Sequence, residues 1–500
     1  MNLTNEQQAI LDNVQNILTG TVMHVLAYAG SGKTFILTML AKLWLSLNPG
    51  KKGLYFAFNK TIASEAGQKM PSGIVSATSH SIAFKVCGIR YRHKMNFKGN
   101  QRLSDFINDE KNLFSEFGGD RNYSFKIAKL TQKTVTNFLH SEDFDMTLNH
   151  VPYALERVAG LDTEDMTKDQ ILALRNRILT KAQGMWEAMK NEKVMSVKMT
   201  PDGYLKMFHL EKHQLGMDLI MFDEAQDANG ANIGILKNQK NCAIVMVGDL
   251  HQAIYQFRGN VNAFEYLPAS EGMTFKVSES FRFGSEVAKV ASAILAFKGE
   301  STPVKGFKEG DEIASFIPEG EKHAFISRTN SGVFMGALNA ISNGKNVHVV
   351  GGGDSLKFPE IEDVLRLSEG TWKGIKDDYV RSFNGKGFDA FKTEVERIED
   401  RDYMRVVKMV EEFGSDLWDM MKQVSENRVK MKDADVVLCT GHKSKGLEWE
   451  NVVLGDDFAQ VDLEKNKVPS EADLNLLYVV ATRAEKRLVL NSSIMALLAG

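Results

Sequence analysis

Short apolar runs that end in polar residues alternate with longer helical patterns along most of the chain. The first half of the chain carries these runs at residues 23–27, 53–58, 218–222 and 243–248. The second half carries them at residues 323–327, 346–350, 436–440, 451–455 and 487–491. Short strands that alternate with helices are typical of parallel sheets covered by helices on both faces. The pattern therefore predicts an α/β protein with two parallel-sheet domains.

Two long segments interrupt this alternation and predict helical insertions, at residues 86–204 and 357–434. The first domain would then consist of residues 1–85 and 205–268, and the second domain of residues 269–356 and 435–500. Residues 85–133 carry 11 Lys and Arg against 5 Asp and Glu, and aromatic residues are interleaved with them. This stretch is typical of a surface that binds nucleic acid, but also of a solvated helical face over its own core.

Composition narrows the possible classes of protein. With 43% hydrophobic and 25% charged residues, the 500-residue chain has a globular composition and is long enough for several domains. Its three cysteines lie far apart and form no CxxC pair, which argues against a disulfide framework or a zinc ribbon and favours a reducing compartment. The polar N-terminus and the lack of a long apolar run argue against secretion and against a membrane span. We therefore expect a cytoplasmic protein, or a nuclear one in a eukaryote.

The net charge of −3 is close to neutral, so binding to nucleic acid would require a local groove.

Residues 27–34 read AYAGSGKT and lie between the predicted strand at 23–27 and a helical run. This order is the context of a phosphate-binding loop, in which glycines let successive backbone N–H groups face the phosphates. Lys33 would reach the β- and γ-phosphates, and the Thr34 hydroxyl would bind Mg²⁺. Ala27 stands where the general pattern has its first glycine. The loop predicts nucleotide contacts by Ala29, Gly30, Ser31, Gly32, Lys33 and Thr34.

The predicted strand at 218–222 runs directly into the acidic segment DEAQD. A carboxylate at the end of a strand beside the phosphate loop binds Mg²⁺ in P-loop NTPases, and we expect this of Asp223. Glu224 would polarise the attacking water. Taken alone, the segment could also be an acidic helix N-terminus, where Asp and Glu are favoured.

Further motifs make the chain resemble the UvrD/Rep/PcrA branch of superfamily 1 helicases along its whole length. The motifs are LTNEQ at 3–7, YFAFNKTIASEA at 55–66, TSHSIAF at 78–84, VGDLHQAIYQFRG at 247–259, ESFRF at 279–283, TGHKSKGLEW at 440–449 and NLLYVVATRA at 475–484. The last two are closest in wording to the F-box DNA helicase subgroup. No segment ahead of Gln7 is long enough for an F-box, so we expect only the motor to be shared. The resemblance implies two RecA-like P-loop domains with two helical insertion subdomains.

The resemblance also implies how ATP and Mg²⁺ would be bound. Gln7 would read the adenine base, and Phe281 would stack on it. Phe35 departs from the pattern, since many relatives carry arginine there, and we expect the adenine to lie between the rings of Phe35 and Phe281. The other implied contacts are Glu448 near the ribose, Gln252 as sensor of the γ-phosphate, and the arginines Arg282 and Arg483, which reach that phosphate from the second domain. The ATP site would therefore be complete only when the two domains close on each other.

Contacts to single-stranded DNA follow from the same motifs. Aromatic faces for stacking on bases would come from Phe56, Phe58, Tyr255 and Phe257. Further contacts, mainly to phosphates, would come from Asn59, His80, Arg258, Thr440 and His442. Two alternatives stay open at this stage. Phe56 or Phe58 could belong to the core-facing set of a strand, and His80 could be a buried structural histidine.

Two departures from the pattern concern the second half of the chain. Leu474 and Asn475 stand where many relatives carry arginines, and the second insertion looks smaller than the corresponding domain of the long relatives.

The leading hypothesis is an ATP-dependent DNA helicase that moves 3′→5′ along single-stranded DNA and acts at junctions with duplex DNA. We expect it to be a monomer and to work with replication, repair or recombination proteins. Two alternatives are a translocase that removes proteins from single strands, and a regulatory subunit whose nucleotide state controls a partner.

Overall fold

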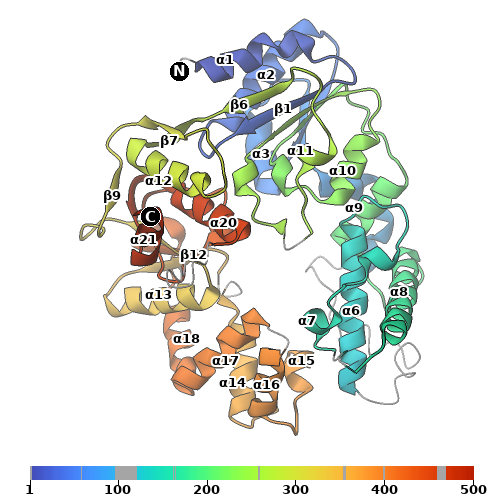
Figure 1. Cartoon of the computed structure of the whole chain (residues 1–500), viewed down its shortest axis with the longest axis vertical. Coiled ribbons are helices and arrows are strands. Elements are labelled where there is room, and N and C mark those ends of the chain that lie inside the picture. The colour runs from blue at the N-terminus through green and yellow to red at the C-terminus, as the bar shows by residue number, and fades with distance from the viewer. Residues whose placement is uncertain are drawn as a thin grey trace.

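Two parallel β-sheets organise the molecule, and each carries one helical insertion (Figure 1). The structure is a computed structural model and describes residues 3–57, 59–95, 121–161, 163, 165–256, 259–352, 356–397, 400–458 and 469–499. All the pairings within the two large sheets are parallel, as the sequence pattern predicts. No helix in these described ranges is both long and apolar enough to cross a membrane.

The first sheet has six strands in the order β3-β2-β4-β5-β1-β6. The strands are β1 (Val22–Ala27), β2 (Gly53–Ala57), β3 (Ile74–Thr78), β4 (Leu219–Phe222), β5 (Ala243–Gly248) and β6 (Thr274–Val277). Strand β4 shows why the central strands read as unbroken apolar runs. Leu219 and Met221 face one apolar core, and Ile220 and Phe222 face the other core on the opposite side of the sheet.

Helices cover both faces of the first sheet. They are α1 (Asn5–Asp12), α2 (Lys33–Leu47), α3 (Lys60–Lys69), α4 (Ser79–Ala83), α9 (Pro201–Leu210), α10 (Gly230–Lys237) and α11 (Ala263–Tyr266), with short helical turns η1 (Val14–Asn16), η6 (Ala225–Asp227) and η7 (Leu250–Gln252). Strand β6 corrects one predicted boundary. It lies beyond residue 268, where we expected the second domain to begin, yet it pairs with β1 at the edge of the first sheet.

The second sheet also has six strands, in the order β11-β12-β10-β13-β14-β9. They are β9 (Glu312–Ala314), β10 (His323–Ser327), β11 (Val347–Val349), β12 (Val436–Thr440), β13 (Trp449–Leu454) and β14 (Ala484–Val489), and a separate pair is formed by β7 (Glu279–Gly284) and β8 (Lys305–Lys308). Its helices are α12 (Ser285–Ala296), α13 (Asn330–Ser342), α19 (Gly441–Ser444), α20 (Glu471–Ala481) and α21 (Ser492–Ala499).

The two insertions are helical where the structure describes them. The first contains a π-helical turn η2 (Phe84–Gly88), η3 (Ile89–Lys94), α6 (Arg121–Leu139), η5 (Leu148–His150), α7 (Leu155–Ala159) and α8 (Lys168–Lys190). The second contains α14 (Phe358–Ser368), α15 (Asp378–Arg381), α16 (Phe388–Arg397), α17 (Arg401–Phe413), α18 (Asp416–Glu426) and η10 (Met431–Asp433). Much of the basic and aromatic stretch predicted at 85–133 lies outside the described residues.

The insertions extend to the same side of the molecule and touch each other (Figure 1). The Lys126 ammonium group on α6 lies 3.0 Å from Oε1 of Glu394 on α16. Arg397, on the same helix as Glu394, donates to the backbone oxygen of Gly160 in the first insertion. The two sheets and two insertions are thus joined in a closed ring of contacts.

Candidate nucleotide site between the two sheets

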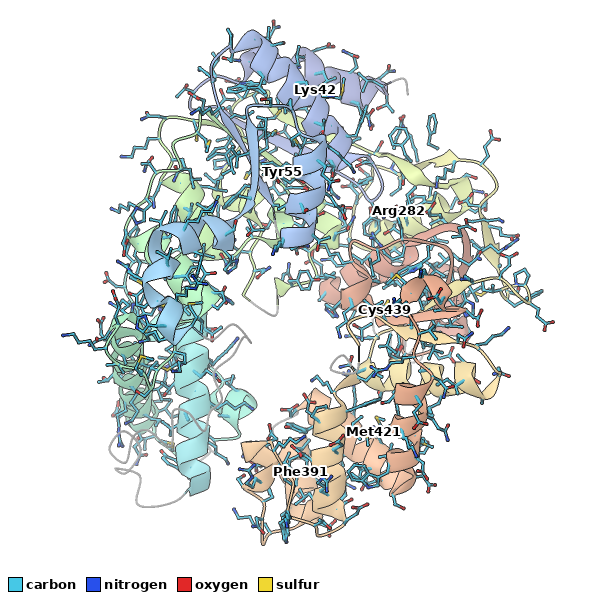
Figure 2. All side chains as sticks on the ribbon, turned by 180° about the vertical axis from the view of Figure 1, so that it is seen from behind. Lys42, Tyr55, Arg282, Phe391, Met421 and Cys439 are labelled. Atoms are coloured by element: carbon cyan, nitrogen blue, oxygen red, sulfur yellow. The ribbon has the colours of Figure 1, made fainter. Side chains whose placement is uncertain are left out.

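A cleft of about 710 Å³ lies where the two sheets meet, within the range of small-molecule sites. One side carries the phosphate loop and Glu224, and the other carries Phe281, Arg282, Lys445 and Arg483. Figure 2 shows this meeting of the sheets from behind and labels Tyr55 on the first side and Arg282 on the second. Residues as far apart along the chain as Gly30 and Glu485 are therefore brought to one site.

The phosphate loop connects β1 to the N-terminus of α2, as the sequence predicts. Gly30 and Gly32 have φ angles of 74° and 79°, in the left-handed region that favours glycine. A Cβ atom on Gly30 would also lie 2.3 Å from Ser280 Oγ, so β7 could not approach a larger residue there. The buried Ser31 hydroxyl has no hydrogen-bond partner among the described residues. The loop thus offers a curled backbone, an unpaired hydroxyl and a helix N-terminus to an anion.

The residues expected around adenine converge on Gly32. A Cβ atom built on Gly32 would lie 3.7 Å from Gln7 Nε2, 3.8 Å from Phe35 Cβ and 3.9 Å from Phe281 Cδ2. Gln7 is held there because it belongs to the capping box of α1 with Thr4 and donates to the Ser31 backbone oxygen at 3.3 Å. Phe35 is 41% exposed, so its side chain is accessible to a ligand.

The two residues expected to bind Mg²⁺ meet at the hydroxyl of Tyr55. Tyr55 lies on β2 and donates to Asp223 Oδ2, and the Thr34 side chain is close enough to act on the pKa of the Tyr55 hydroxyl. Asp223 is almost completely buried, and burial and the charge of Glu224 raise its pKa to about 6. A carboxylate and a hydroxyl side by side fit the oxygen ligands that Mg²⁺ prefers.

Glu224 lies between cations from both sheets. Its Oε1 is 3.8 Å from the Lys33 ammonium group, and its Oε2 is 3.7 Å from that of Lys445. Burial acts to raise its pKa, but the two ammonium groups, a hydrogen bond from Gln226 and the charge of Arg483 together lower the pKa to about 2. Its backbone has φ of 53°, a conformation uncommon outside glycine and found at functional sites. Glu224 is therefore ionised near neutral pH and can accept a hydrogen bond from water.

Lys445 was not singled out from the sequence, although it lies in the motif at 440–449. Its ammonium group bonds to the Asp227 carboxylate and donates to the Gln252 backbone oxygen at 2.7 Å. Burial raises the pKa of Asp227 to about 6 despite this cation. Through Glu224, Asp227 and Gln252, Lys445 connects the second sheet to three groups of the first.

The predicted arginines Arg282 and Arg483 lie next to each other on the second side of the cleft. Arg282 pairs with Glu448, Nε to Oε2 at 2.7 Å, and donates to the Thr482 backbone oxygen at 3.0 Å. Arg483 is 1% exposed and donates to the Val479 backbone oxygen at 2.8 Å. Burial, together with the charge of Arg282, lowers the pKa of Arg483 to about 9. Two neighbouring guanidinium groups are a favourable place for an anion such as a phosphate.

Gln252, the expected γ-phosphate sensor, also lines the cleft. Its Nε2 donates to Asp249 Oδ2 at 2.8 Å. The predicted residues that line the cleft are Gly30, Ser31, Gly32, Lys33, Thr34, Phe35, Glu224, Gln252, Phe281, Arg282, Glu448 and Arg483, whereas Gln7, Ala29 and Asp223 are not part of its lining.

The residues expected to contact DNA are more scattered. Tyr255 lines the nucleotide cleft and donates to the His442 backbone oxygen at 3.1 Å, which joins the two sheets. Asn59 also lines the cleft, and its side chain caps α3 by accepting from the Ile62 N–H group. Thr440 ends β12 just before α19. The Nε2 atom of His80 forms a hydrogen bond of 3.0 Å with Oδ1 of Asp202, which lies on α9.

Phe56 corrects the sequence-based expectation. Its side chain is 1% exposed and packs against Phe222, with ring centroids 5.3 Å apart. Phe56 therefore belongs to the core-facing set of β2 and offers no open ring face to a base. The expected DNA contacts Phe58, Phe257 and Arg258 lie outside the described residues.

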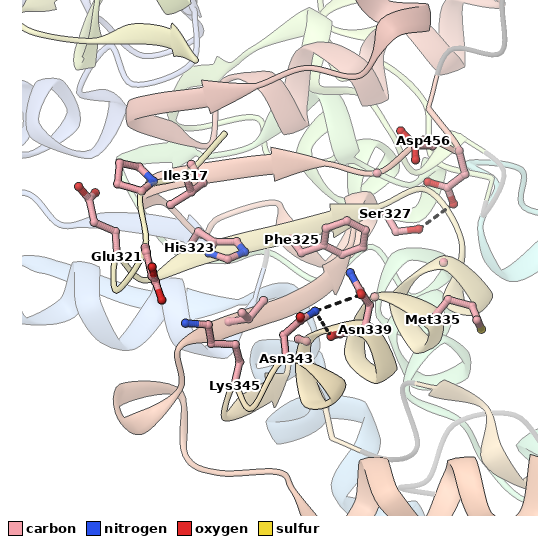
Figure 3. Close-up of a pocket in the computed structure, with 18 of the residues that line it drawn as sticks. Ile317, Glu321, His323, Phe325, Ser327, Met335, Asn339, Asn343, Lys345 and Asp456 are labelled. Atoms are coloured by element: carbon pink, nitrogen blue, oxygen red, sulfur yellow. Dashed lines mark hydrogen bonds between the residues drawn. The ribbon is translucent and has the colours of Figure 1, made fainter. Parts of the chain in front are cut away.

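A second pocket of about 850 Å³ lies on the second sheet, between β10 and α13 (Figure 3). Several of its polar groups are already paired within the fold. Ser327 donates to Asp457 Oδ2 at 2.7 Å, and Asn343 donates to the Asn339 backbone oxygen at 2.8 Å. Because the phosphate loop and the arginines are absent from its lining, the cleft between the sheets is the better nucleotide site.

The fold and the cleft define a class, the two-sheet P-loop NTPases whose site is completed by arginines from the second sheet. Within that class the chain belongs to the UvrD/REP helicase family. The UvrD/REP helicase N-terminal domain matches residues 3–267, and the UvrD-like helicase C-terminal domain matches residues 435–491. The expected α/β fold class and the resemblance to UvrD-like helicases are thereby confirmed.

Two curated relatives are similar over 99% of this chain. F-box DNA helicase 1 of Gallus gallus is 32% identical, and F-box DNA helicase protein 1 of Schizosaccharomyces pombe is 29% identical. The chain spans 50% and 58% of the length of these two proteins, respectively.

Proposed function

We propose that this chain is the motor of an ATP-dependent DNA helicase that moves 3′→5′ along single-stranded DNA and unwinds duplex at junctions. One observation carries the proposal: the phosphate loop and acidic residues come from one sheet, while Arg282, Arg483 and Lys445 come from the other. A nucleotide in this cleft would hold the sheets together, and its hydrolysis would release them. The DNA substrate is supported by the names of the two relatives.

The chain's own groups fit ATP and Mg²⁺. The curled loop and the unpaired Ser31 hydroxyl suit phosphates, and the Gly32 surroundings suit a flat base. Thr34 and Asp223 would hold Mg²⁺, which would neutralise charge on the β,γ-oxygens. Lys33 would bind the same phosphates, and Glu224 would orient the attacking water by accepting its proton in a hydrogen bond. Arg282 and Arg483 would stabilise the charge that develops on the transferred group.

Ligand binding would have to rearrange the ion pairs that occupy the cleft. Glu448 engages Arg282, and Lys33 and Lys445 engage Glu224. Phosphates would compete for these cations and release the Glu224 carboxylate towards water. This exchange of partners is the step by which nucleotide binding would be sensed.

Coupling to DNA would run through the contact of Tyr255 with His442, because it crosses the interface and lies beside the nucleotide cleft. A change in the distance between the sheets would move both residues. Alternating grip on a strand by the two sheets would convert that motion into steps.

The first test is ATP hydrolysis with and without a single-stranded oligonucleotide at two salt concentrations. We expect strong stimulation that weakens as salt rises, because phosphate contacts release counterions. Strand displacement from duplexes with a 3′ or a 5′ tail then tests polarity, and we expect release only from the 3′-tailed duplex. Stimulated hydrolysis without displacement of either strand would favour the translocase, and bound ATP without stimulation would favour the regulatory subunit.

A further inference from the structure

Lys298 lies just beyond α12 of the second sheet, and its ammonium group reaches the first sheet. Its Nζ is 3.1 Å from His251 Nδ1, hydrogen-bonds to Asn475 Oδ1, and lies 3.5 Å from Glu471 Oε1. The Lys298 side chain is 8% exposed, whereas Glu471 is 70% exposed. Glu471 is largely solvated, so its ion pair with the buried ammonium group contributes little to stability, although the carboxylates of Asp249 and Glu300 also act on that group. An apolar side chain of similar size would be cheaper to bury.

Lys298 and its partner Asn475 hold the two residues on either side of Gln252 in the chain, His251 and Ala253. His251 precedes Gln252, and Asn475 Nδ2 donates to the backbone oxygen of Ala253, which follows it, at 3.0 Å. Burial lowers the pKa of His251, so its imidazole is neutral and Nδ1 can accept from the ammonium group. Lys298 therefore fixes one neighbour of Gln252 directly and the other through Asn475.

The same contacts fix Gln252 relative to the arginines. Asn475 lies on α20, and Arg483 follows the end of that helix by two residues. The Lys298 ammonium group thus contacts both the segment that contains Gln252 and the helix that leads to Arg483. Leu474 and Asn475 stand where the resemblance leads one to expect arginines, and Lys298 brings a cation to this place from the turn that follows α12.

We propose that Lys298 is a positioning residue for ATP hydrolysis, which holds Gln252 and Arg483 in register across the interface. The inference rests on the proposed function. It assigns Lys298 no contact with the nucleotide, since the residue is not among those that line the cleft. Loss of its ammonium group should leave nucleotide binding intact and slow turnover, because the reacting groups would be misplaced.

The test compares Lys298→Met, which keeps the length of the side chain, with Lys298→Arg, which keeps the charge. For Lys298→Met we expect DNA-stimulated kcat to fall about tenfold and KM for ATP to change less than about twofold, and Lys298→Arg should recover most of the rate. Lys289→Met is the matched control, because Lys289 lies on α12 and its side chain is 71% exposed. Melting temperatures are measured for every variant.

An unchanged kcat in folded Lys298→Met would overturn the inference, and so would a lower melting temperature with normal kcat. If Lys298→Met does not fold, Asn475→Ala cuts the same link and must show the same split between kcat and KM, or the inference fails. A wild-type chain without DNA-stimulated hydrolysis would overturn the proposed function and this inference together. A stimulated wild type with an unaffected Lys298→Met would overturn the inference alone.

Discussion

The hydroxyl oxygen of Tyr478 accepts a hydrogen bond from the backbone N–H of Ala29 at 3.1 Å, and so joins α20 of the second sheet to the phosphate loop. The same hydroxyl donates to Asp249 Oδ2 at 3.1 Å, an oxygen that also accepts from Gln252. Tyr478 is completely buried, so water cannot replace either bond. Any change in the separation of the sheets must therefore break one of these contacts or move the phosphate loop.

Replacing Tyr478 by Phe should impair hydrolysis without unfolding the chain. The change leaves the Ala29 N–H group and an Asp249 oxygen without this partner, at a cost of about 1–3 kcal/mol. We expect kcat/KM for ATP to fall about tenfold, which corresponds to about 1.4 kcal/mol. Steady-state kinetics check this, with Tyr153→Phe as the control because Tyr153 is 93% exposed. Equal kcat/KM values for Tyr478→Phe and the wild type would show that the bond has no part in the cleft.

Lys33→Ala should abolish hydrolysis and leave the fold intact. The Lys33 ammonium group lies at the phosphate loop, 3.8 Å from Glu224, and in the proposed function it would supply charge to the transferred phosphate. Loss of such a group costs about 10²–10³-fold in kcat. Lys42→Ala on the same helix is the control, because Lys42 is exposed (Figure 2). An unfolded Lys33→Ala chain would mean that the lysine serves the core rather than the site.

Glu224→Gln should retain ATP and DNA binding but stop turnover. The amide keeps the shape of the side chain and removes the charge that, in the proposed function, would orient the water. Loss of a general base typically costs about 10²–10⁴-fold in rate. Glu65→Gln serves as control, since Glu65 lies on α3 and lines the same cleft. Retained turnover in single-turnover kinetics of Glu224→Gln would exclude this residue as the base.

The strands that the sequence predicts are those with unbroken apolar runs, such as β4 and β5, because both faces of these strands meet a core. The strands it does not predict lie at or near sheet edges or outside the two large sheets. Strand β6 alternates exposed and half-buried residues before one buried valine, and β9 has only three residues. Such strands are stabilised by pairing with a neighbouring strand, which cannot be predicted from the hydrophobic pattern of the segment itself.

The same limit applies to the nucleotide site. Residues within one motif, such as Gly30 and Lys33, could be predicted because a local turn places them. Lys445 and Tyr478 could not, because their contacts with Glu224 and Ala29 depend on how the two sheets meet. Phe56 shows that a motif can also mislead. The motif gives the residue type, but it does not show that the Phe56 side chain lies on the core-facing side of β2.

Asp227 should make the chain less stable as pH rises from about 4 to 6. Burial raises its pKa from 3.8 to about 6, so over this range the folded state holds a proton that the unfolded state releases. The free energy of unfolding then decreases with rising pH, by up to about 3 kcal/mol for this group. Asp227→Asn should reduce the difference between urea midpoints at pH 5 and pH 7.5. Asp419→Asn, at an exposed site, should leave that difference as in the wild type. If Asp227→Asn shows the same difference between urea midpoints as the wild type, the raised pKa does not belong to Asp227.

The contact between the insertions can be tested by exchanging charges, because Lys126 and Glu394 are each about 15% exposed and face each other at 3.0 Å. Lys126→Glu places two carboxylates together, and Glu394→Lys places an ammonium group beside Lys126 and Arg397. Each single change should separate α6 from α16 and increase the radius of gyration measured by small-angle X-ray scattering. The double exchange restores an opposite pair and should return the radius towards that of the wild type, with a coupling energy of about 1 kcal/mol.

Lys168→Glu, on the exposed start of α8, controls for charge alone. If both single variants scatter like the wild type, the ring of contacts is held by other residues. If the double variant stays as expanded as the single variants, the ion pair itself is not what joins the insertions.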